Sequence, residues 1–357
     1  MSKARGLADL GNAYSDGALS NRNLIINGSF LVAQRGTSFA GITQGTAKYT
    51  LDRYFADIST STSVAFTVAQ SSDAPQGLNS SLGVTLTTSG ATGAGDYSYL
   101  RQMVEGYNFA HLNFGTANAQ TVTLSFWVKS SLTGTFGGYL GAAANARFRT
   151  FSYTISVANT WEYKTVTVSG DTTGTWNNTN SIGIQVAWSL SCGTTYQGAA
   201  GTWGASLLLG ATGQTNLTET AGATLNIAGV QLEAGDTATP FEHRNYGQEL
   251  ALCQRYFYRF GAGPSQRIGV HNSAGGATIS DPVSFPVTMR AVPSGSVATA
   301  PTTLIIRTVA DTPSAVPTTL TAAGQGVDIW AVSGNATLAD AAQILFFNAV
   351  LHFDAEL

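Results

Sequence analysis

The chain has 357 residues, of which 43% are hydrophobic and only 10% are charged, and its formal net charge is −3. The length allows about two domains, and the hydrophobic share is enough for packed cores. The weak negative charge and the lack of a basic cluster argue against a nucleic-acid partner. With 40 glycines and 10% aromatic residues, the composition fits many short strands joined by turns, and excludes a collagen-like or disordered chain.

The first residues, Met1-Ser2-Lys3-Ala4-Arg5-Gly6, lack the apolar core of a signal peptide, and no apolar run approaches the ~20 residues of a membrane span. We therefore expect no membrane span and a protein that folds in a cytoplasm. Residues 1–21 are rich in Gly, Ala, Ser, Asp and Asn, which predicts either an extended arm that becomes ordered on a partner or a frayed terminus. Cys192 and Cys253 are far apart, and we expect two buried free thiols.

Strand patterns follow from Asn23 onward. Apolar residues form short runs or alternate with polar ones, and glycine-rich turns separate these segments. The predicted strands are Leu24–Ile26, 51–56, 64–68, 84–86, 122–128, 161–168, 182–188 and 225–232, and one helical turn is predicted over 109–114. This spacing predicts a mainly β protein whose first domain, residues 23–242, is an antiparallel jelly-roll sandwich.

A single convincing helix follows at Tyr246–Phe257, within a linker that we place at residues 243–260. Tyr246, Leu250, Cys253 and Phe257 are three or four residues apart and would form one stripe. Since so short a helix is marginal alone in water, we expect the stripe to pack between the two β domains or against copies of itself in an oligomer.

Residues 261–357 predict a distal β-sandwich domain. Its predicted strands are 283–289, 304–306, 327–331 and 344–355. The last of these is long and partly apolar on both faces, which would favour aggregation if it stood at an exposed edge. We therefore expect it to be buried in a subunit interface.

No known catalytic motif is present: the sequence lacks His-Glu-x-x-His, Cys-x-x-Cys, a P-loop and Gly-x-Ser-x-Gly. Paired carboxylates could hydrolyse glycosides, but the acidic candidates are scattered one per strand. They are Asp52, Asp57, Glu105, Glu162 and Glu233. The four histidines are isolated, so we expect no catalytic residues and no enzyme.

Three aromatic residues in loops rich in Gly, Thr and Asn are candidates for ligand contact, because aromatic faces suit sugar rings. They are Trp176, Tyr196 and Trp203. The alternative is that they anchor their loops to the sandwich; Trp127 and Trp188 are expected to alternate into the core instead. Asn27 and Glu233 could supply oxygen ligands to a structural Ca²⁺ from the first and last strands, and no other cofactor is expected.

Several motifs in order resemble one family. They are Asn23-Leu24-Ile25-Ile26-Asn27-Gly28-Ser29-Phe30, Gln34-Arg35-Gly36-Thr37, Tyr49-Thr50-Leu51-Asp52-Arg53-Tyr54-Phe55, Leu124-Ser125-Phe126-Trp127-Val128-Lys129-Ser130 and Gly229-Val230-Gln231-Leu232-Glu233-Ala234-Gly235. Over roughly residues 20–260 the chain resembles fibre proteins of tailed phages that contain a jelly roll like that of carbohydrate-binding modules. Ser284–Pro293 resembles the start of their distal domain, and residues 7–13 and 17–23 resemble their virion-attached arms. Asn27 stands where sugar-binding relatives often have Asp.

The resemblance implies a structural protein of the virion. It implies a homotrimeric fibre attached to other virion proteins through residues 1–22, whose distal residues 261–357 contact the host surface and whose receptor is a cell-surface polysaccharide. A head fibre or capsid decoration, a polysaccharide depolymerase and a free-standing secreted lectin are the competing hypotheses.

Overall fold

The computed structural model describes residues 21–143, 147–261, 266–271, 278–299, 303–308, 313–314, 320–324, 329–335, 342–347 and 350–357. It describes side chains in residues 21–143, 147–261, 284–296 and 351–357. The chain divides into two compact units, Met1–Tyr246 with Leu357, and Gly247–Glu356. The predicted attachment arm, residues 1–22, lies outside the described residues except for its last two positions.

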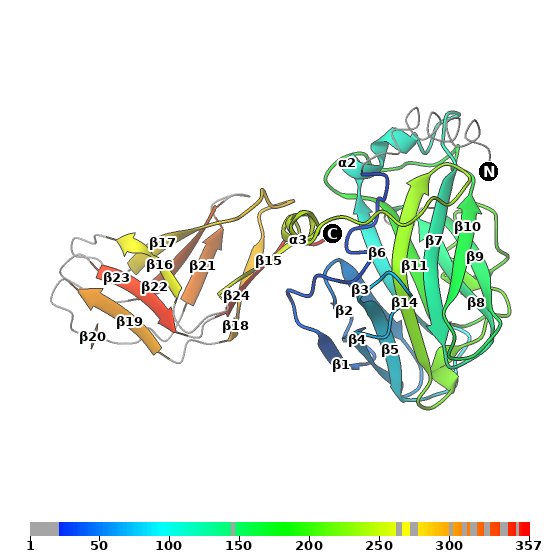
Figure 1. Cartoon of the computed structure of the whole chain (residues 1–357), viewed down its shortest axis with the longest axis horizontal. Coiled ribbons are helices and arrows are strands. Elements are labelled where there is room, and N and C mark those ends of the chain that lie inside the picture. The colour runs from blue at the N-terminus through cyan, green and yellow to red at the C-terminus, as the bar shows by residue number, and fades with distance from the viewer. Residues whose placement is uncertain are drawn as a thin grey trace. The chain divides into compact units, whose positions relative to one another are not determined.

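The first unit is a sandwich of two six-stranded sheets (Figure 1). Sheet A has, in spatial order, β1 (Ser38–Ile42), β4 (Ala65–Ser71), β5 (Ser81–Thr88), β14 (Thr224–Ala234), β7 (Val122–Ser130) and β10 (Glu162–Val168). Sheet B has β2 (Lys48–Tyr49), β3 (Tyr54–Ser59), β6 (Tyr97–Glu105), β11 (Ile182–Cys192), β8 (Gly134–Gly141) and β9 (Phe148–Ile155). Every pair within the two sheets is antiparallel, which confirms the predicted fold class.

Three single turns of helix that the structure describes in full, and a short strand pair, lie outside the two large sheets. The turns are α2 (Gly106–Phe109), η1 (Ala110–Leu112) and η3 (Leu217–Glu219), and the parallel pair is β12 (Gln197–Gly198) with β13 (Gly210–Ala211). The helical turn predicted at 109–114 therefore begins three residues earlier, at Gly106.

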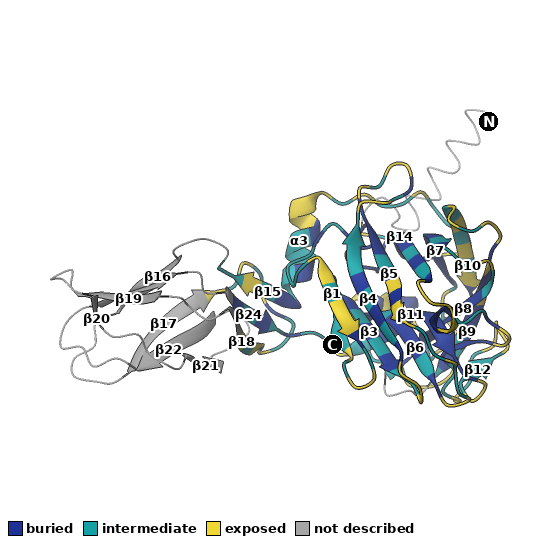
Figure 2. Cartoon of the chain, turned by 90° about the horizontal axis from the view of Figure 1, so that it is seen from below, coloured by how far each residue is buried: buried dark blue, intermediate teal, exposed yellow. Residues whose placement is uncertain are grey.

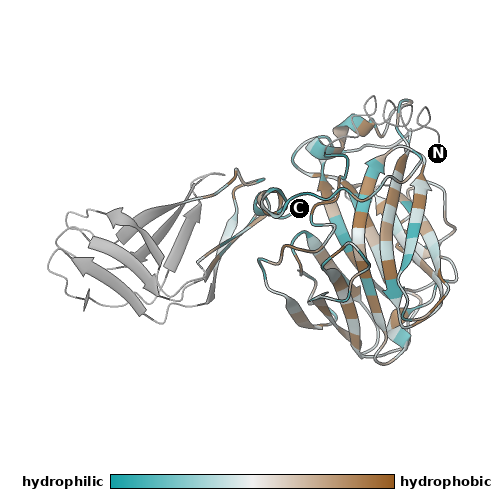
Figure 3. Cartoon of the chain, viewed as in Figure 1, coloured by the Kyte–Doolittle hydropathy of each residue, from teal (hydrophilic) through white to brown (hydrophobic). Residues whose placement is uncertain are grey.

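Successive residues of a strand point to opposite faces of the sheet, and this decides which side chains enter the core. Burial and hydropathy therefore change from residue to residue along the sandwich strands (Figures 2 and 3). In β7, Leu124, Phe126 and Val128 are fully buried between the sheets. Phe126 meets Trp188 of β11 edge-to-face, with ring centroids 5.6 Å apart. The prediction was right for Trp188 and wrong for Trp127, because Trp127 has the opposite phase to its buried neighbours and is only partly buried.

The segment before β1, which contains the predicted strand Leu24–Ile26, is irregular and is not a strand of either sheet. The Gln102 side chain satisfies the backbone of Ile26, as a neighbouring strand would. Its oxygen accepts from the Ile26 N–H and its nitrogen donates to the Ile26 carbonyl, each at 2.8 Å. Asn27 adopts the left-handed conformation at φ 59°, and Gly28 then passes Val230 so closely that a Cβ would lie 2.2 Å from the Val230 carbonyl oxygen. The Asn-Gly pair is therefore required by this close approach.

The second unit contains three short sheets and the helix α3 (Tyr246–Gln254), which begins at the boundary. Their strands, in spatial order, are β15 (Phe257–Phe260), β24 (Val350–Asp354) and β18 (Ser294–Thr299); β16 (Gln266–His271), β23 (Ala342–Phe347), β19 (Thr303–Thr308) and β20 (Pro313–Ser314); and β17 (Thr278–Ser284), β22 (Ile329–Asn335) and β21 (Leu320–Gly324). The single strand predicted over 344–355 was wrong: the segment contains β23 and β24, which belong to different sheets.

The helix is three residues shorter than predicted, because Phe257 begins β15. Its buried residues are Glu249 and Cys253, whereas Tyr246 is 56% exposed and Leu250 is partly buried. The Tyr256 carbonyl accepts from Ala355 N–H at 2.8 Å, so the segment after the helix is held to the end of the second unit. Packing of the Tyr246, Leu250, Cys253 and Phe257 stripe against another copy stays a prediction.

Two further expectations concern the described residues. Cys192 and Cys253 are both free and buried, as predicted. No helix in the described part of the chain is long and apolar enough to cross a membrane.

Candidate ligand-binding site

The outer face of sheet B carries a group of aromatic and charged side chains on two neighbouring strands. Alternation in β3 turns Tyr54, Ala56 and Ile58 into the core and leaves Phe55 and Asp57 on the outside. The pairing of β3 with β6 places Phe55 opposite Arg101, and Asp57 opposite Tyr99. We call Phe55, Asp57, Tyr97, Tyr99 and Arg101 the shelf.

The segment that follows β11 covers one side of the shelf. Tyr99 packs there in a small second core with Tyr139, Phe148, Ala187, Cys192 and Leu209. Tyr196 belongs to the same segment and its carbonyl accepts from Leu209 N–H at 2.8 Å, which closes the loop over the sheet. The other four shelf residues, Phe55, Asp57, Tyr97 and Arg101, remain partly exposed at the edge of this cover.

The rings of the shelf are fixed against one another. Tyr97 stacks on Tyr99 with centroids 5.6 Å apart, and Tyr196 meets Tyr97 edge-to-face at 5.5 Å. The Arg101 guanidinium lies 5.0 Å from the centre of the Phe55 ring and 5.4 Å from that of Tyr99. Cation–π contacts of this length hold the arginine flat over the rings.

Hydrogen bonds then fix the polar groups. The Tyr99 hydroxyl donates to Asp57 Oδ2 at 2.8 Å, and Arg101 donates to the Gln185 side-chain oxygen at 2.8 Å. Gln185 in turn donates to the Ala142 carbonyl at 2.8 Å. Asp57 Oδ1 accepts no hydrogen bond from another described residue, so one carboxylate oxygen remains available to a ligand.

Burial raises the pKa of Tyr99, and the nearby Tyr139 and Asp57 raise it further. Burial also raises the pKa of Tyr97, with Asp57 acting in the same direction. Both phenols therefore stay neutral at physiological pH. The shelf offers neutral aromatic faces, one carboxylate and one guanidinium.

Such a set suits a sugar, because aromatic faces pack against C–H-rich ring surfaces while a carboxylate and a guanidinium bond to hydroxyls. Of the predicted contact residues, Tyr196 lies beside the shelf. Of the shelf residues, only Asp57 was named from the sequence as a candidate functional residue; Phe55 was not, and Tyr97, Tyr99 and Arg101 of β6 were missed. The signal for them was an alternation of Tyr97, Tyr99 and Arg101, three large side chains on one face of a single strand.

Trp176 and Trp203 lie elsewhere, at a cluster with Phe109 and Phe114. The two indoles meet edge-to-face at 5.2 Å, and each donates its N–H to a backbone carbonyl, Trp176 to Thr173 and Trp203 to Ser169. Both pack against the main core. Ligand contact by these two residues stays a prediction.

The donors at Asn27 and Glu233 do not fit a structural Ca²⁺. The Asn27 side-chain oxygen accepts from Val32 N–H, and its amide donates to the carbonyls of Val32 and Asp52. The Glu233 carboxylate accepts from the backbone and hydroxyl of Thr239. Among the residues that the structure describes, no three His, Cys, Asp or Glu side chains gather as metal ligands.

Two of the acidic candidates for hydrolysis, Asp52 and Glu162, also bond to protein partners. Asp52 accepts from the Gln34 backbone and side chain, both at 2.6 Å, and Glu162 pairs with Lys164 at 2.6 Å. Burial raises the pKa of Asp52, because the two Gln34 bonds offset only part of its desolvation. Asp52 is thus a buried structural carboxyl group of the turn before β3.

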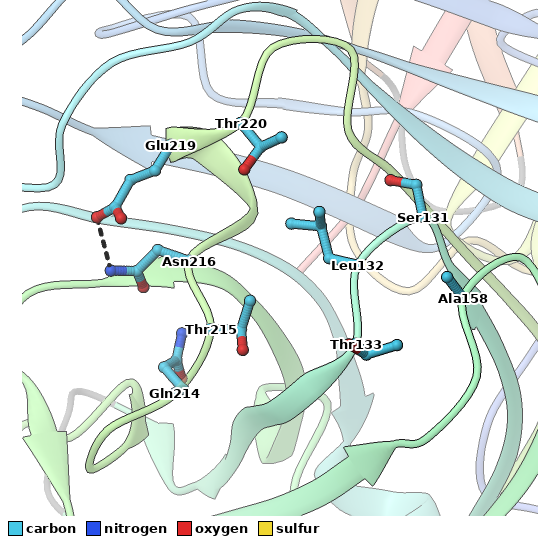
Figure 4. Close-up of a pocket in the computed structure, with 9 residues that line it drawn as sticks. All are labelled: Ser131, Leu132, Thr133, Ala158, Gln214, Thr215, Asn216, Glu219 and Thr220. Carbon is cyan, nitrogen blue, oxygen red and sulfur yellow. Dashed lines mark hydrogen bonds between the residues drawn. The ribbon is translucent and has the colours of Figure 1, made fainter.

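A pocket of about 480 Å³ lies at another place on the sandwich (Figure 4). It is lined by Ser131, Leu132, Thr133, Ala158, Gln214, Thr215, Asn216, Glu219 and Thr220. Asn216 donates to the Glu219 carboxylate at 3.0 Å on one side of this pocket. The lining contains no aromatic ring, so it lacks the stacking surface that the shelf provides.

No protein-family model and no curated protein matches the chain. Among solved structures it is similar to the enzymatically active domain of tailspike protein 4 of bacteriophage CBA120, with 11% identity and a TM-score of 0.34 over 60% of this chain but only 22% of that chain. It is also similar to TmCBM61 in complex with β-1,4-galactotriose, with 13% identity and a TM-score of 0.31 over 60% of this chain and 100% of that one.

A third similar structure is the family 11 carbohydrate-binding module of the Clostridium thermocellum cellulase Lic26A-Cel5E, with 8% identity and a TM-score of 0.30 over 56% of this chain and 96% of that one. At these identities and TM-scores, the similarities assign no site and no activity to this chain.

Proposed function

We propose that this chain is a fibre protein of a tailed-phage virion, and that its sandwich attaches the particle to a host-surface glycan through the shelf on sheet B. The observation that carries glycan binding is the set of ordered rings beside Asp57 and Arg101 on an open sheet face. The phage role rests on the sequence motifs over roughly residues 20–260.

Binding is the proposed activity, without catalysis. The shelf has one carboxylate, Asp57, whereas glycoside hydrolysis by the usual routes needs two that flank the bond. A polysaccharide depolymerase is the alternative, and release of reducing ends from the bound glycan by the purified chain would establish it.

The decisive experiment measures glycan binding by the wild type and by Tyr97→Ala and Asp57→Asn. A library of defined bacterial oligosaccharides is screened first, and affinities are then measured on the best binder. Each substitution should weaken binding at least roughly tenfold, which corresponds to about 1.4 kcal/mol. Tyr107→Ala is the matched control, because Tyr107 is 62% exposed on α2 outside the shelf. Equal affinity in all four proteins would reject the shelf as the site.

The place of the protein in a particle needs its own tests. Antibody labelling of virions distinguishes a tail fibre from a head fibre or a capsid decoration. Deletion of residues 1–20 should leave a folded protein that no longer incorporates into particles. Loss of folding in that truncated chain would contradict the proposed attachment role of the arm.

A further inference from the structure

The outer face of sheet A is hollowed at a row of short side chains. Strand pairing places Ala69 of β4 opposite Gly83 of β5, Gly83 opposite Asn226 of β14, and Asn226 opposite Lys129 of β7. A Cβ at Gly83 would lie 3.1 Å from the Asn226 side-chain nitrogen, so the missing side chain opens the face at this point. The resulting groove has a volume of about 600 Å³.

One rim of the groove is built from an ion pair, and the Trp161 indole, which does not line the groove, bonds to that pair. Lys129 Nζ lies 2.6 Å from Asp73 Oδ2, and the Trp161 indole N–H donates to Asp73 Oδ1 at 3.0 Å. Both carboxylate oxygens of Asp73 are thus used to fix the ammonium group and the indole. The Lys129 hydrogen bond also holds the pKa of Asp73 below its usual value, so the pair stays ionised at neutral pH.

The floor and the other rim keep polar groups without protein partners. Asn226 donates to Ser81 Oγ at 3.2 Å, but its side-chain oxygen bonds to no other described residue. The Asn159 amide and the Thr85 hydroxyl also line the groove, and neither makes a side-chain hydrogen bond within the described part of the chain. The groove therefore offers an amide and a hydroxyl on strands of the sheet, at Asn226 and Thr85, and a second amide in a loop, at Asn159.

We propose that this groove is a second carbohydrate site, which takes a neutral sugar unit and lies on the opposite sheet from the shelf. The rim ion pair is self-neutralising, so the groove has no excess positive charge for a phosphate. Its floor is polar, which disfavours an apolar peptide. The amide and hydroxyl groups of the lining match the hydroxyls of a sugar, and the volume falls within the ~300–1,000 Å³ of small-molecule sites.

The Trp161 indole gives a direct readout. The chain has 6 tryptophans, and incorporation of 5-fluorotryptophan gives each its own ¹⁹F resonance, with that of Trp161 assigned by its loss in Trp161→Phe. The full-length protein is titrated with a panel of neutral oligosaccharides. We expect a saturable shift of the Trp161 resonance in the wild type and also in Tyr97→Ala, because the groove does not share residues with the shelf.

Gly83→Val fills the groove and should abolish the shift. Thr87→Val is the matched control, since Thr87 is exposed on the same face of β5 outside the groove lining, and it should retain the shift. Asn159→Ala should weaken binding at least fivefold. Because Asn159 lies in a loop, this variant tests the groove independently if Gly83→Val does not fold.

The proposal would be overturned if no neutral sugar shifted the Trp161 resonance of the wild type. It would also be overturned if the shift in Gly83→Val and in Asn159→Ala were as large as in the wild type. Loss of the shift in Tyr97→Ala would show one site, on the shelf alone.

Discussion

The Asn23 backbone N–H donates to Glu242 Oε2 at 2.9 Å, although the two residues are 219 positions apart. Arg244 strengthens the same junction by donating to the carbonyls of Ile25, at 3.1 Å, and Asn23. The chain thus enters and leaves the sandwich at one point. The two ends of the sandwich are therefore held together by side-chain hydrogen bonds.

This junction yields the first prediction. Glu242→Ala removes the acceptor of two backbone N–H groups, those of Asn21 and Asn23, and should lower the free energy of unfolding of the sandwich by about 3 kcal/mol. Amide hydrogen exchange at Asn23 and Leu24 should become faster. Asp236→Ala is the control, because Asp236 is an exposed carboxylate of the same stretch and should change stability by less than about 0.5 kcal/mol. Equal exchange in both variants would show that Glu242 does not hold the junction.

The second prediction concerns Gly28. Gly28→Ala puts a methyl group where the Val230 carbonyl oxygen stands, and should cost about 2–3 kcal/mol through a forced backbone shift. Gly95→Ala is a matched control, because nothing lies within 4 Å of the position of its Cβ. Denaturant unfolding measures both. Identical midpoints would mean that the segment moves away from β14 at no cost.

The strands that the sequence predicted are of two kinds. In β4 and β10 one face is more buried than the other, whereas β11 and β14 are buried on both faces over most of their length. In β7 the phase of Leu124, Phe126 and Val128 predicted the strand, and the same phase already places Trp127 outside. In contrast, β8 was missed because it is rich in glycine, which is a poor strand former. Gly138 is required there, since a Cβ would lie 2.2 Å from the Ala187 carbonyl oxygen.

The shelf was predictable only in pieces. Asp57 and Tyr196 were both noticed as single residues, one as a carboxylate and one as a loop aromatic. The pairing of β3 with β6 brings Asp57 next to Tyr99. These two strands are neighbours in the sheet, although β4 and β5 lie between them in the sequence. Non-local pairing of this kind leaves no signal in the periodicity of either strand.

The third prediction tests a buried ion pair. Asp171 is 3% exposed and accepts from Arg147 Nε at 2.6 Å and Nη2 at 2.9 Å. Burial alone would raise the pKa of Asp171, but hydrogen bonds from Arg147 and Thr173 and the Arg147 charge outweigh it and hold the pKa below its ordinary value of 3.8. Asp171→Asn should therefore cost about 3 kcal/mol at pH 7.

The pH dependence has a defined sign. Because the pKa of Asp171 is lowered on folding, its contribution is complete above the unfolded value and is lost as the pH falls through the folded value. The difference between wild type and Asp171→Asn should thus shrink only below about pH 4. Asp73→Asn breaks a pair of equal length, but Asp73 is 47% exposed, so its cost should stay below about 1 kcal/mol. Equal costs in the two variants would contradict the role of burial.

The fourth prediction separates loop anchoring from ligand contact at Trp203. Its indole stacks edge-to-face on Trp176 and donates to the Ser169 carbonyl at 2.8 Å. Trp203→Ala should lower the free energy of unfolding by about 2 kcal/mol and leave glycan affinity unchanged. Trp203→Phe keeps a ring and should recover about half of the loss. A variant of normal stability with lost glycan binding would instead support ligand contact.

The fifth prediction is the oligomeric state. A homotrimer would have three times the 37.1 kDa of one chain, about 111 kDa by light scattering. Tyr246 is 56% exposed and Leu250 only partly buried in the single chain, so an oligomer contact on α3 would cover apolar surface that is otherwise in water. Tyr246→Asp should then reduce the mass to that of one chain. Tyr107→Asp, a similarly exposed tyrosine outside α3, should leave the trimer intact. A wild-type mass of 37.1 kDa would reject the trimer, and a trimer insensitive to Tyr246→Asp would place its contacts away from the exposed side of α3.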